Sequence, residues 1–100
     1  MDIKELTDRM HNFVHSKGWY NPASKRPQTQ RNLAISLSLE ASEVLEHFQW
    51  LDEPNKKDEL AGELADVALY LLQLAAVSGV DLEQAVLKKI ATNANRTWDS

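Results

Sequence analysis

The chain has 100 residues, and its 15 acidic and 11 basic side chains give a formal net charge of -4 at pH 7. This length predicts a single domain that spans residues 1–100. The acidic balance argues against a nucleic-acid polymer as partner, because phosphate backbones attract basic surfaces, and the absence of cysteine excludes disulfides and thiolate metal sites.

Apolar residues recur with the period of an α-helix through most of the chain. The four helices that this pattern predicts cover residues 2–16, 30–50, 56–77 and 81–95. Gly18 and two prolines interrupt the pattern after the first helix, Pro54 ends the second, and Asp81 is a suitable N-cap for the fourth. Four helices with mostly short connections predict an all-α, four-helix bundle-like fold.

The third predicted helix is apolar over most of its circumference. Its single polar stripe consists of Glu59, Glu63, Asp66, Tyr70 and Gln73. A helix that is apolar nearly all round must be central or must pack against another chain, and in so small a domain the second option predicts an oligomer. The apolar run at 64–77 is shorter than a membrane span, and the N-terminus carries no signal-like apolar region. We therefore expect a cytoplasmic protein with no membrane partner.

Two pairs of acidic residues, three positions apart, lie on the second and third predicted helices. They are Glu40 with Glu43 and Glu63 with Asp66. Each pair shares one helix face, and a short turn favours antiparallel neighbours, so the four carboxylates could meet in one pocket. Such a cluster requires a cation or raised pKa values, and oxygen ligands suit Mg²⁺ or, as the alternative, Mn²⁺. The other interpretation of such pairs is a solvated helix face.

The histidines do not fit the main competing metal architecture. A di-iron carboxylate bundle needs Glu-x-x-His on two helices, but His47 follows Glu43 by four residues and the third predicted helix has no histidine. His11 and His15 lie four apart on the first predicted helix without an accompanying pattern of acids, which indicates surface residues rather than a zinc site.

Aromatic and polar residues follow the acid pairs along the predicted helices. Trp50 lies two turns beyond Glu43, and Tyr70 lies one turn beyond the second acid pair, so either ring could stack on a base. Aromatic residues at helical spacing are otherwise usually core residues. Lys89 and Asn93, four apart on the last predicted helix, could contact a phosphate and a sugar or base.

The segments EASEVLEHFQW, ELADVALYLL and VDLEQAVLKKIATN together resemble the MazG-like all-α nucleoside triphosphate pyrophosphohydrolases, and within that family the dCTP pyrophosphatase branch. The resemblance implies hydrolysis of a nucleoside triphosphate between its α- and β-phosphates, with a monophosphate and pyrophosphate as products. It also implies Mg²⁺ as the cofactor and assembly as a dimer or a dimer of dimers, with active sites near the subunit contacts.

By motif position, the resemblance implies a role for each matching residue. The metal ligands would be Glu40, Glu43, Glu63 and Asp66, and we take Glu43 as the candidate general base. The residues around the nucleotide would be Trp19, Trp50, Tyr70, Lys89 and Asn93. The expected substrate is a (deoxy)nucleoside triphosphate and the expected role is clearance of dCTP-like nucleotides, with base selectivity supplied by the loop between Trp19 and Arg31.

Two other interpretations stay open. Phosphoribosyl-ATP pyrophosphatases of histidine synthesis share the acid scaffold, although the FQW sequence at 48–50 and Tyr70 favour free nucleotides. A non-enzymatic helical interaction module would simply expose its acids to solvent. Magnesium-dependent release of pyrophosphate separates the enzymatic interpretations from this last one.

Overall fold

The computed structural model describes residues 1–53 and 56–97. Within these residues it contains four helices and no strand: α1 (Ile3–Ser16), α2 (Gln30–Glu46), α3 (Lys57–Val77) and α4 (Leu82–Ala94). The prediction of an all-α chain is confirmed, and the helices begin and end close to their predicted bounds except at the end of α2.

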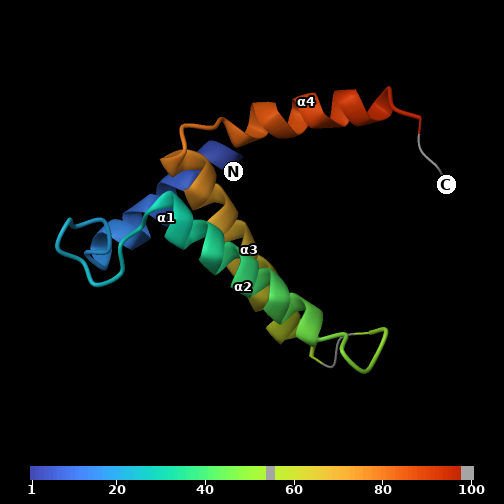
Figure 1. Cartoon of the computed structure of the whole chain (residues 1–100), viewed down its shortest axis with the longest axis horizontal. Coiled ribbons are helices and arrows are strands. Elements are labelled where there is room, and N and C mark those ends of the chain that lie inside the picture. The colour runs from blue at the N-terminus through green and yellow to red at the C-terminus, as the bar shows by residue number, and fades with distance from the viewer. Residues whose placement is uncertain (54–55, 98–100) are drawn as a thin grey trace.

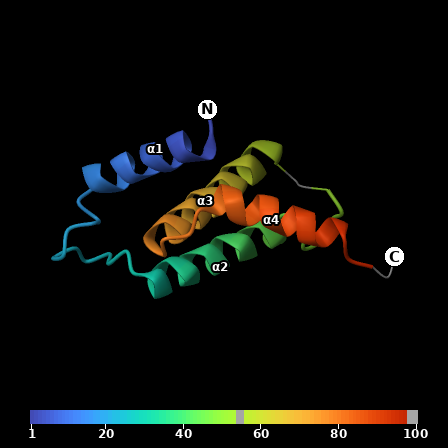
Figure 2. The ribbon, with the colours of Figure 1, turned by 90° about the horizontal axis from the view of Figure 1, so that it is seen from above.

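The helices α2 and α3 run antiparallel along each other, and α1 packs against α3 (Figures 1 and 2). Buried apolar side chains come from these three helices: Met10, Val14, Leu33 and Leu72. Gln73, 3% exposed, is the one buried polar residue in the described part of the chain. The core of a single chain is therefore small, and much of the apolar surface predicted to be buried stays exposed.

The C-termini of α1 and α3 share one type of turn, in which a glycine with positive φ follows the helix. These glycines are Gly18, with φ 73°, and Gly79, with φ 70°. After α1 the amide of Trp19 donates to the carbonyl of Val14, as in a Schellman motif. The same turn sets the Trp19 ring edge-on to Phe13, with 5.7 Å between ring centroids. Trp19 is thereby held against α1 at the start of the loop.

The second helix ends earlier than the sequence predicts. It begins after the N-cap Thr29, whose hydroxyl accepts from the amide of Asn32 at 3.1 Å. It ends at Glu46, so the prediction of a helix through Trp50 was wrong. The amides of the next residues bond three positions back, which tightens the chain into a turn. The predicted break at Pro54 lies outside the described residues.

The fourth helix lies apart from the other three (Figure 1). It contains no buried residue and exposes three large apolar side chains, those of Val86, Leu87 and Ile90. The Cα radius of gyration is 16.1 Å, whereas a compact domain of this length would have about 13 Å. The chain is thus a three-helix body with a projecting fourth helix, and the predicted four-helix bundle does not close within one copy.

The third helix has the length and apolar composition of a membrane span, by those two criteria alone. The helix is longer than the apolar run of the sequence suggests, because it extends back to Lys57. Of its most apolar 18-residue window, 17% is buried within the chain. Since α2 packs along α3 and Glu63 on α3 contacts His47, one side of this helix is polar and already occupied. α1 packs on another part of α3, but Leu64, Leu69 and Leu71 stay exposed within the described residues.

Candidate functional site

Glu40 lies half-buried on α2. Its Oε2 is buried and has no hydrogen-bond partner among the residues that the structure describes. Burial raises the pKa of the Glu40 carboxyl, and a hydrogen bond with Glu43 and the negative charges of Glu43, Asp66 and Glu63 raise it further. The two acid pairs therefore interact electrostatically across the α2–α3 contact.

The four carboxylates do not form a closed set of ligands. Within residues 1–53 and 56–97, no group of three or more His, Cys, Asp or Glu side chains could hold a metal ion. Their chemistry nevertheless fits a hard divalent cation, because the donors are carboxylate oxygens and the buried Glu40 Oε2 lacks a partner within the described chain. Glu43 and Asp66 are exposed, so both side chains can turn toward a cation without disturbing the core.

His47 connects the end of α2 to this acid cluster. Its Nε2 lies 2.5 Å from Glu63 Oε2, and the two side chains are 9% and 27% exposed. The contact holds one carboxylate oxygen of Glu63 and joins α2 to α3 beside the acid pairs. Sequence reasoning considered His47 only as a mismatch to a di-iron motif. A residue just past the end of a helix follows no helical period, so the contact left no pattern to detect.

A cavity of about 730 Å³ opens beside the acid pairs, lined by α1, α2, α3 and the loop between α1 and α2. Asp66 lines this cavity, as do Trp19 and Tyr70 from the predicted nucleotide-contacting residues. Three cationic side chains also line it: Arg9, Lys25 and Arg26. The volume is typical of small-molecule sites. A predicted metal ligand, two predicted aromatic contacts and three cations therefore share one cavity.

The loop between α1 and α2 is held over the cavity by its own contacts. The Arg26 guanidinium lies 5.5 Å from the centroid of the Trp19 ring, within the range of a cation–π interaction. Asn32 Nδ2 donates to the carbonyl of Pro27 at 3.0 Å, and Gln28 Nε2 donates to the carbonyl of Arg26 at 2.7 Å. Sequence reasoning missed the basic residues of this cavity, because charges in a loop carry no periodic pattern.

Three predicted contact residues lie outside this cavity. Trp50 follows the end of α2 and is 86% exposed, so the predicted placement on one helix face with Glu43 was wrong. Lys89 and Asn93 belong to α4, which projects away from the α2–α3 pair (Figure 1). Contact of these three residues with a nucleotide stays a prediction.

Comparison with known proteins identifies a matching family and several similar proteins. The MazG-like family model matches residues 35–98. The chain is 41% identical over 75 residues to dCTP pyrophosphatase 1 of Mus musculus and 40% identical over 75 residues to that of Homo sapiens; both matches cover 66% of this chain and 44% of the relative. The chain thus spans less than half of the length of these relatives.

Two further comparisons concern a phage protein and a solved structure. A dATP/dGTP diphosphohydrolase of Salmonella phage PMBT28 is 50% identical over 38 residues, which cover 38% of this chain and 13% of the phage protein. The crystal structure of a pyrophosphatase from Archaeoglobus fulgidus superposes with a TM-score of 0.76 at 36% sequence identity. That superposition covers 90% of this chain and 86% of the archaeal chain, so the two chains share one fold.

Proposed function

Because the chain belongs to the MazG-like family, we propose that it hydrolyses (deoxy)nucleoside triphosphates to a nucleoside monophosphate and pyrophosphate. The observation that carries this proposal is the environment of Glu40, whose carboxyl is affected by the charges of three other acids. One of those acids, Asp66, lines a cavity together with Trp19 and Tyr70. A cation held by the acids would therefore adjoin a nucleotide held in the cavity.

The proposed cofactor is Mg²⁺, with Mn²⁺ as the alternative. Its ligands would come from both acid pairs: Glu40, Glu43, Glu63 and Asp66. When bound, such a cation neutralises phosphate charge and makes water more acidic. It would also supply the positive charge that the four carboxylates lack among themselves, which supports the assignment.

The chain's own side chains account for the other parts of the reaction. Glu43 accepts a proton from the attacking water, because it is exposed and adjoins the half-buried Glu40. The water oxygen bonds to the α-phosphorus while the bond from that phosphorus to the bridging oxygen breaks, and the electron pair leaves with pyrophosphate. The cationic side chains of the cavity offset the charge of the phosphates. His47 holds the Glu63 carboxylate in place.

The proposed substrate is a deoxynucleoside triphosphate of the dCTP type, and the proposed role is clearance of such nucleotides from the cytoplasmic pool. Trp19 and Tyr70 give the cavity aromatic surfaces on which any base can stack. The relatives described as dCTP pyrophosphatase 1 and dATP/dGTP diphosphohydrolase support a deoxynucleotide. The proposal needs neither a nucleic-acid polymer nor a membrane as partner.

The proposed functional form is a homodimer or a dimer of dimers. α3 exposes Leu64, Leu69 and Leu71, and α4 exposes an apolar face of its own. A second copy would cover both surfaces. This supports self-association, rather than insertion into a membrane, as the reason for the apolar composition of α3. The projecting α4 would then carry Lys89 and Asn93 to the site of the partner copy.

The decisive experiment is a pyrophosphate-release assay on the purified chain with a panel of eight NTPs and dNTPs plus phosphoribosyl-ATP, with and without Mg²⁺. Magnesium-dependent release from at least one deoxynucleotide is the expected result. Release from phosphoribosyl-ATP alone would move the assignment to the histidine pathway. Absence of release from every compound would favour a helical interaction module.

A further inference from the structure

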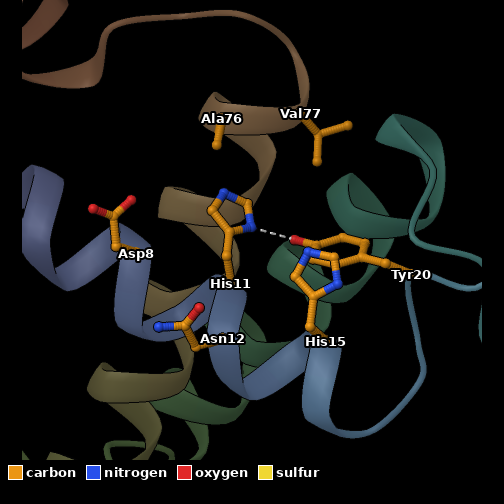
Figure 3. A pocket seen from close by; sticks show the side chains of 7 residues that line it. All are labelled: Asp8, His11, Asn12, His15, Tyr20, Ala76 and Val77. Atoms are coloured by element: carbon orange, nitrogen blue, oxygen red, sulfur yellow. Dashed lines mark hydrogen bonds between the residues drawn. The ribbon is translucent and has the colours of Figure 1, made fainter.

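Gln73 is the centre of a hydrogen-bond network that joins α1, α3 and the loop between α1 and α2. Its Nε2 lies 3.2 Å from the hydroxyl of Tyr20 and 2.8 Å from Oε1 of Gln28. The Tyr20 hydroxyl also lies 2.6 Å from Nδ1 of His11 (Figure 3). Gln73 itself is 3% exposed, whereas glutamine is usually a surface residue.

The partners at the ends of this network fix the orientation of the Gln73 amide. The carbonyl of Arg26 can only accept, so the Gln28 side chain must donate to it through Nε2, as observed at 2.7 Å. Gln28 Oε1 is then the acceptor that faces Gln73, which forces the NH₂ group of Gln73 toward Gln28 and Tyr20. Both protons of the Gln73 amide are thereby used.

The carbonyl oxygen of Gln73 takes no part in this network, and Gln73 lines the same cavity as Asp66 and Tyr70. The three residues follow one another along α3 at helical spacing, so they share one side of the helix. Gln73 lies seven positions after Asp66, which is about 10 Å along the helix axis. An extended ligand with phosphates near Asp66 can therefore reach Gln73 with its other end.

We propose that Gln73 is a specificity-determining residue, whose Oε1 accepts a hydrogen bond from the exocyclic amine of a nucleobase. Cytosine and adenine carry such an amine, whereas uracil and hypoxanthine present a carbonyl oxygen at the same place. The network prevents the Gln73 amide from turning its NH₂ group into the cavity. With uracil or hypoxanthine, the carbonyl oxygen of the base would therefore face the carbonyl oxygen of Gln73, which is unfavourable. The inference rests on the proposed nucleotide site, and it adds a preference for amino-bearing bases that stacking on Trp19 or Tyr70 cannot supply.

The test measures binding rather than turnover. Calorimetry on the full chain in EDTA measures the affinities of two pairs of nucleotides, dCMP with dUMP and dAMP with dIMP. Within each pair, one base carries the exocyclic amine and the other carries a carbonyl oxygen in its place. We expect the amine-bearing member of each pair to bind about tenfold more tightly, the contribution of one hydrogen bond. Gln73→Met, of similar length but without a carbonyl, should bring each pair to equal affinity. Gln84→Met, on the exposed face of α4, is the matched control and should keep the preference.

A second variant covers the case in which Gln73→Met does not fold, as circular dichroism would reveal. Gln28→Ala leaves Gln73 in place but removes the acceptor that orients it, so the amide can present either its oxygen or its nitrogen. The preference for the amine-bearing nucleotide of each pair should then become smaller, as in Gln73→Met. Equal affinity for both members of each pair in the unmodified chain, failure to bind any of the four, or a preference that survives both variants would overturn the inference.

Calorimetry and the pyrophosphate-release assay together separate this inference from the proposed function. A chain that discriminates dCMP from dUMP through Gln73 but releases no pyrophosphate from any triphosphate would contradict the hydrolytic proposal alone. A chain that releases pyrophosphate with no preference within either pair would contradict the role of Gln73 alone.

Discussion

His47 Nε2 and Glu63 Oε2 lie 2.5 Å apart, across the contact between the end of α2 and the first half of α3. The His47 side chain is only 9% exposed, so the contact is shielded from water on the histidine side. A hydrogen bond to one carboxylate oxygen leaves the other oxygen of Glu63 available for a cation. Mutation of residues that orient a metal ligand in this way typically lowers metal affinity or activity by roughly 10- to 100-fold.

The first prediction concerns this orientation. His47→Ala should raise the Mg²⁺ concentration that gives half-maximal pyrophosphate release about tenfold, because the Glu63 carboxylate is then free to rotate. A magnesium titration of the initial rate measures the change. His15→Ala, which removes an exposed histidine of α1, is the control. An unchanged magnesium requirement in His47→Ala would show that the contact only supports the fold.

The second prediction concerns the acid cluster. Glu63→Ala or Asp66→Ala should abolish pyrophosphate release, while each variant keeps its helical circular dichroism. Asp66→Ala should unfold at the same or a higher temperature than the unmodified chain in EDTA, because removal of one carboxylate relieves repulsion on Glu40. Glu63→Ala should unfold at a lower temperature, because it also removes the contact with His47 that joins α2 to α3. Mg²⁺ should raise the unfolding temperature of the unmodified chain but not of the variants. Near-normal turnover in both variants would remove the metal site.

The third prediction distinguishes Trp19, which lines the cavity, from Trp50, which lies outside it. Trp19→Ala should weaken binding of every accepted nucleotide by roughly tenfold or more, because the ring lines the cavity and stacks without regard to the base. Trp50→Ala should have a similar effect only where a second copy covers this exposed ring. Michaelis constants for several dNTPs measure both effects, and values unchanged by Trp19→Ala would assign that ring to packing against Phe13.

The fourth prediction concerns pH. Burial raises the pKa of the Tyr20 hydroxyl above its ordinary value of 10.0, and the hydrogen bond from Gln73 only partly opposes this. The unfolded chain therefore loses the Tyr20 proton at lower pH than the folded chain does. The neutral hydroxyl contributes fully below about pH 10, and its contribution falls as the pH rises through the raised pKa. Denaturant unfolding at pH 8 to 11 should show the difference in unfolding free energy between the unmodified chain and Tyr20→Phe decreasing with pH. A difference that is constant over this range would contradict the buried assignment.

The fifth prediction concerns assembly. Light scattering at micromolar concentration should give at least a dimer, because α3 and α4 expose too much apolar surface for a stable monomer. Ile90→Asp should shift the chain toward monomer, whereas Lys88→Asp, on the opposite side of α4, should not. A monomeric unmodified chain would contradict the proposed assembly.

A mixing experiment extends this prediction to the site itself. Glu63→Ala and Lys89→Ala should each be inactive, but a mixture of the two should regain roughly one quarter of normal activity if sites are shared between copies, because half of the random dimers contain one intact site. No recovery, with mixed dimers present, would contradict a site shared between copies.

The sequence predicts the parts of this molecule that are local or periodic. Asp81 caps α4 as expected, with its Oδ1 3.0 Å from the amide of Gln84, and Gly79 ends α3. The acid pairs were found because a spacing of three places both carboxylates on one helix face. The end of α2 was not found, since His47 to Trp50 continue a helix-compatible composition and no glycine or proline lies between Glu46 and Pro54.

The remaining features depend on contacts between distant segments. Arg9 and Arg26 reach one cavity from α1 and from the following loop, and neither position shows a pattern that links them. Gln73 looked like one more member of a polar stripe until its partners on the loop were known. The direction of α4 was also beyond prediction, because helical periodicity sets which face is apolar and not where the helix points.

The direction of α4 relative to α3 is set by the four connecting residues, 78–81. After α3 the amides of Gly79 and Val80 bond back to the carbonyls of Ala76 and Ala75 at 3.1 and 2.8 Å, and the next residue, Asp81, caps α4. Both helix ends are thus satisfied inside the connection, which leaves the backbone little freedom to bend there. Two copies that meet can then dock with α4 already extended and need not refold. Encounter between subunits should therefore proceed at the rate of rigid-body docking, without a slow unimolecular step, even in freshly diluted protein.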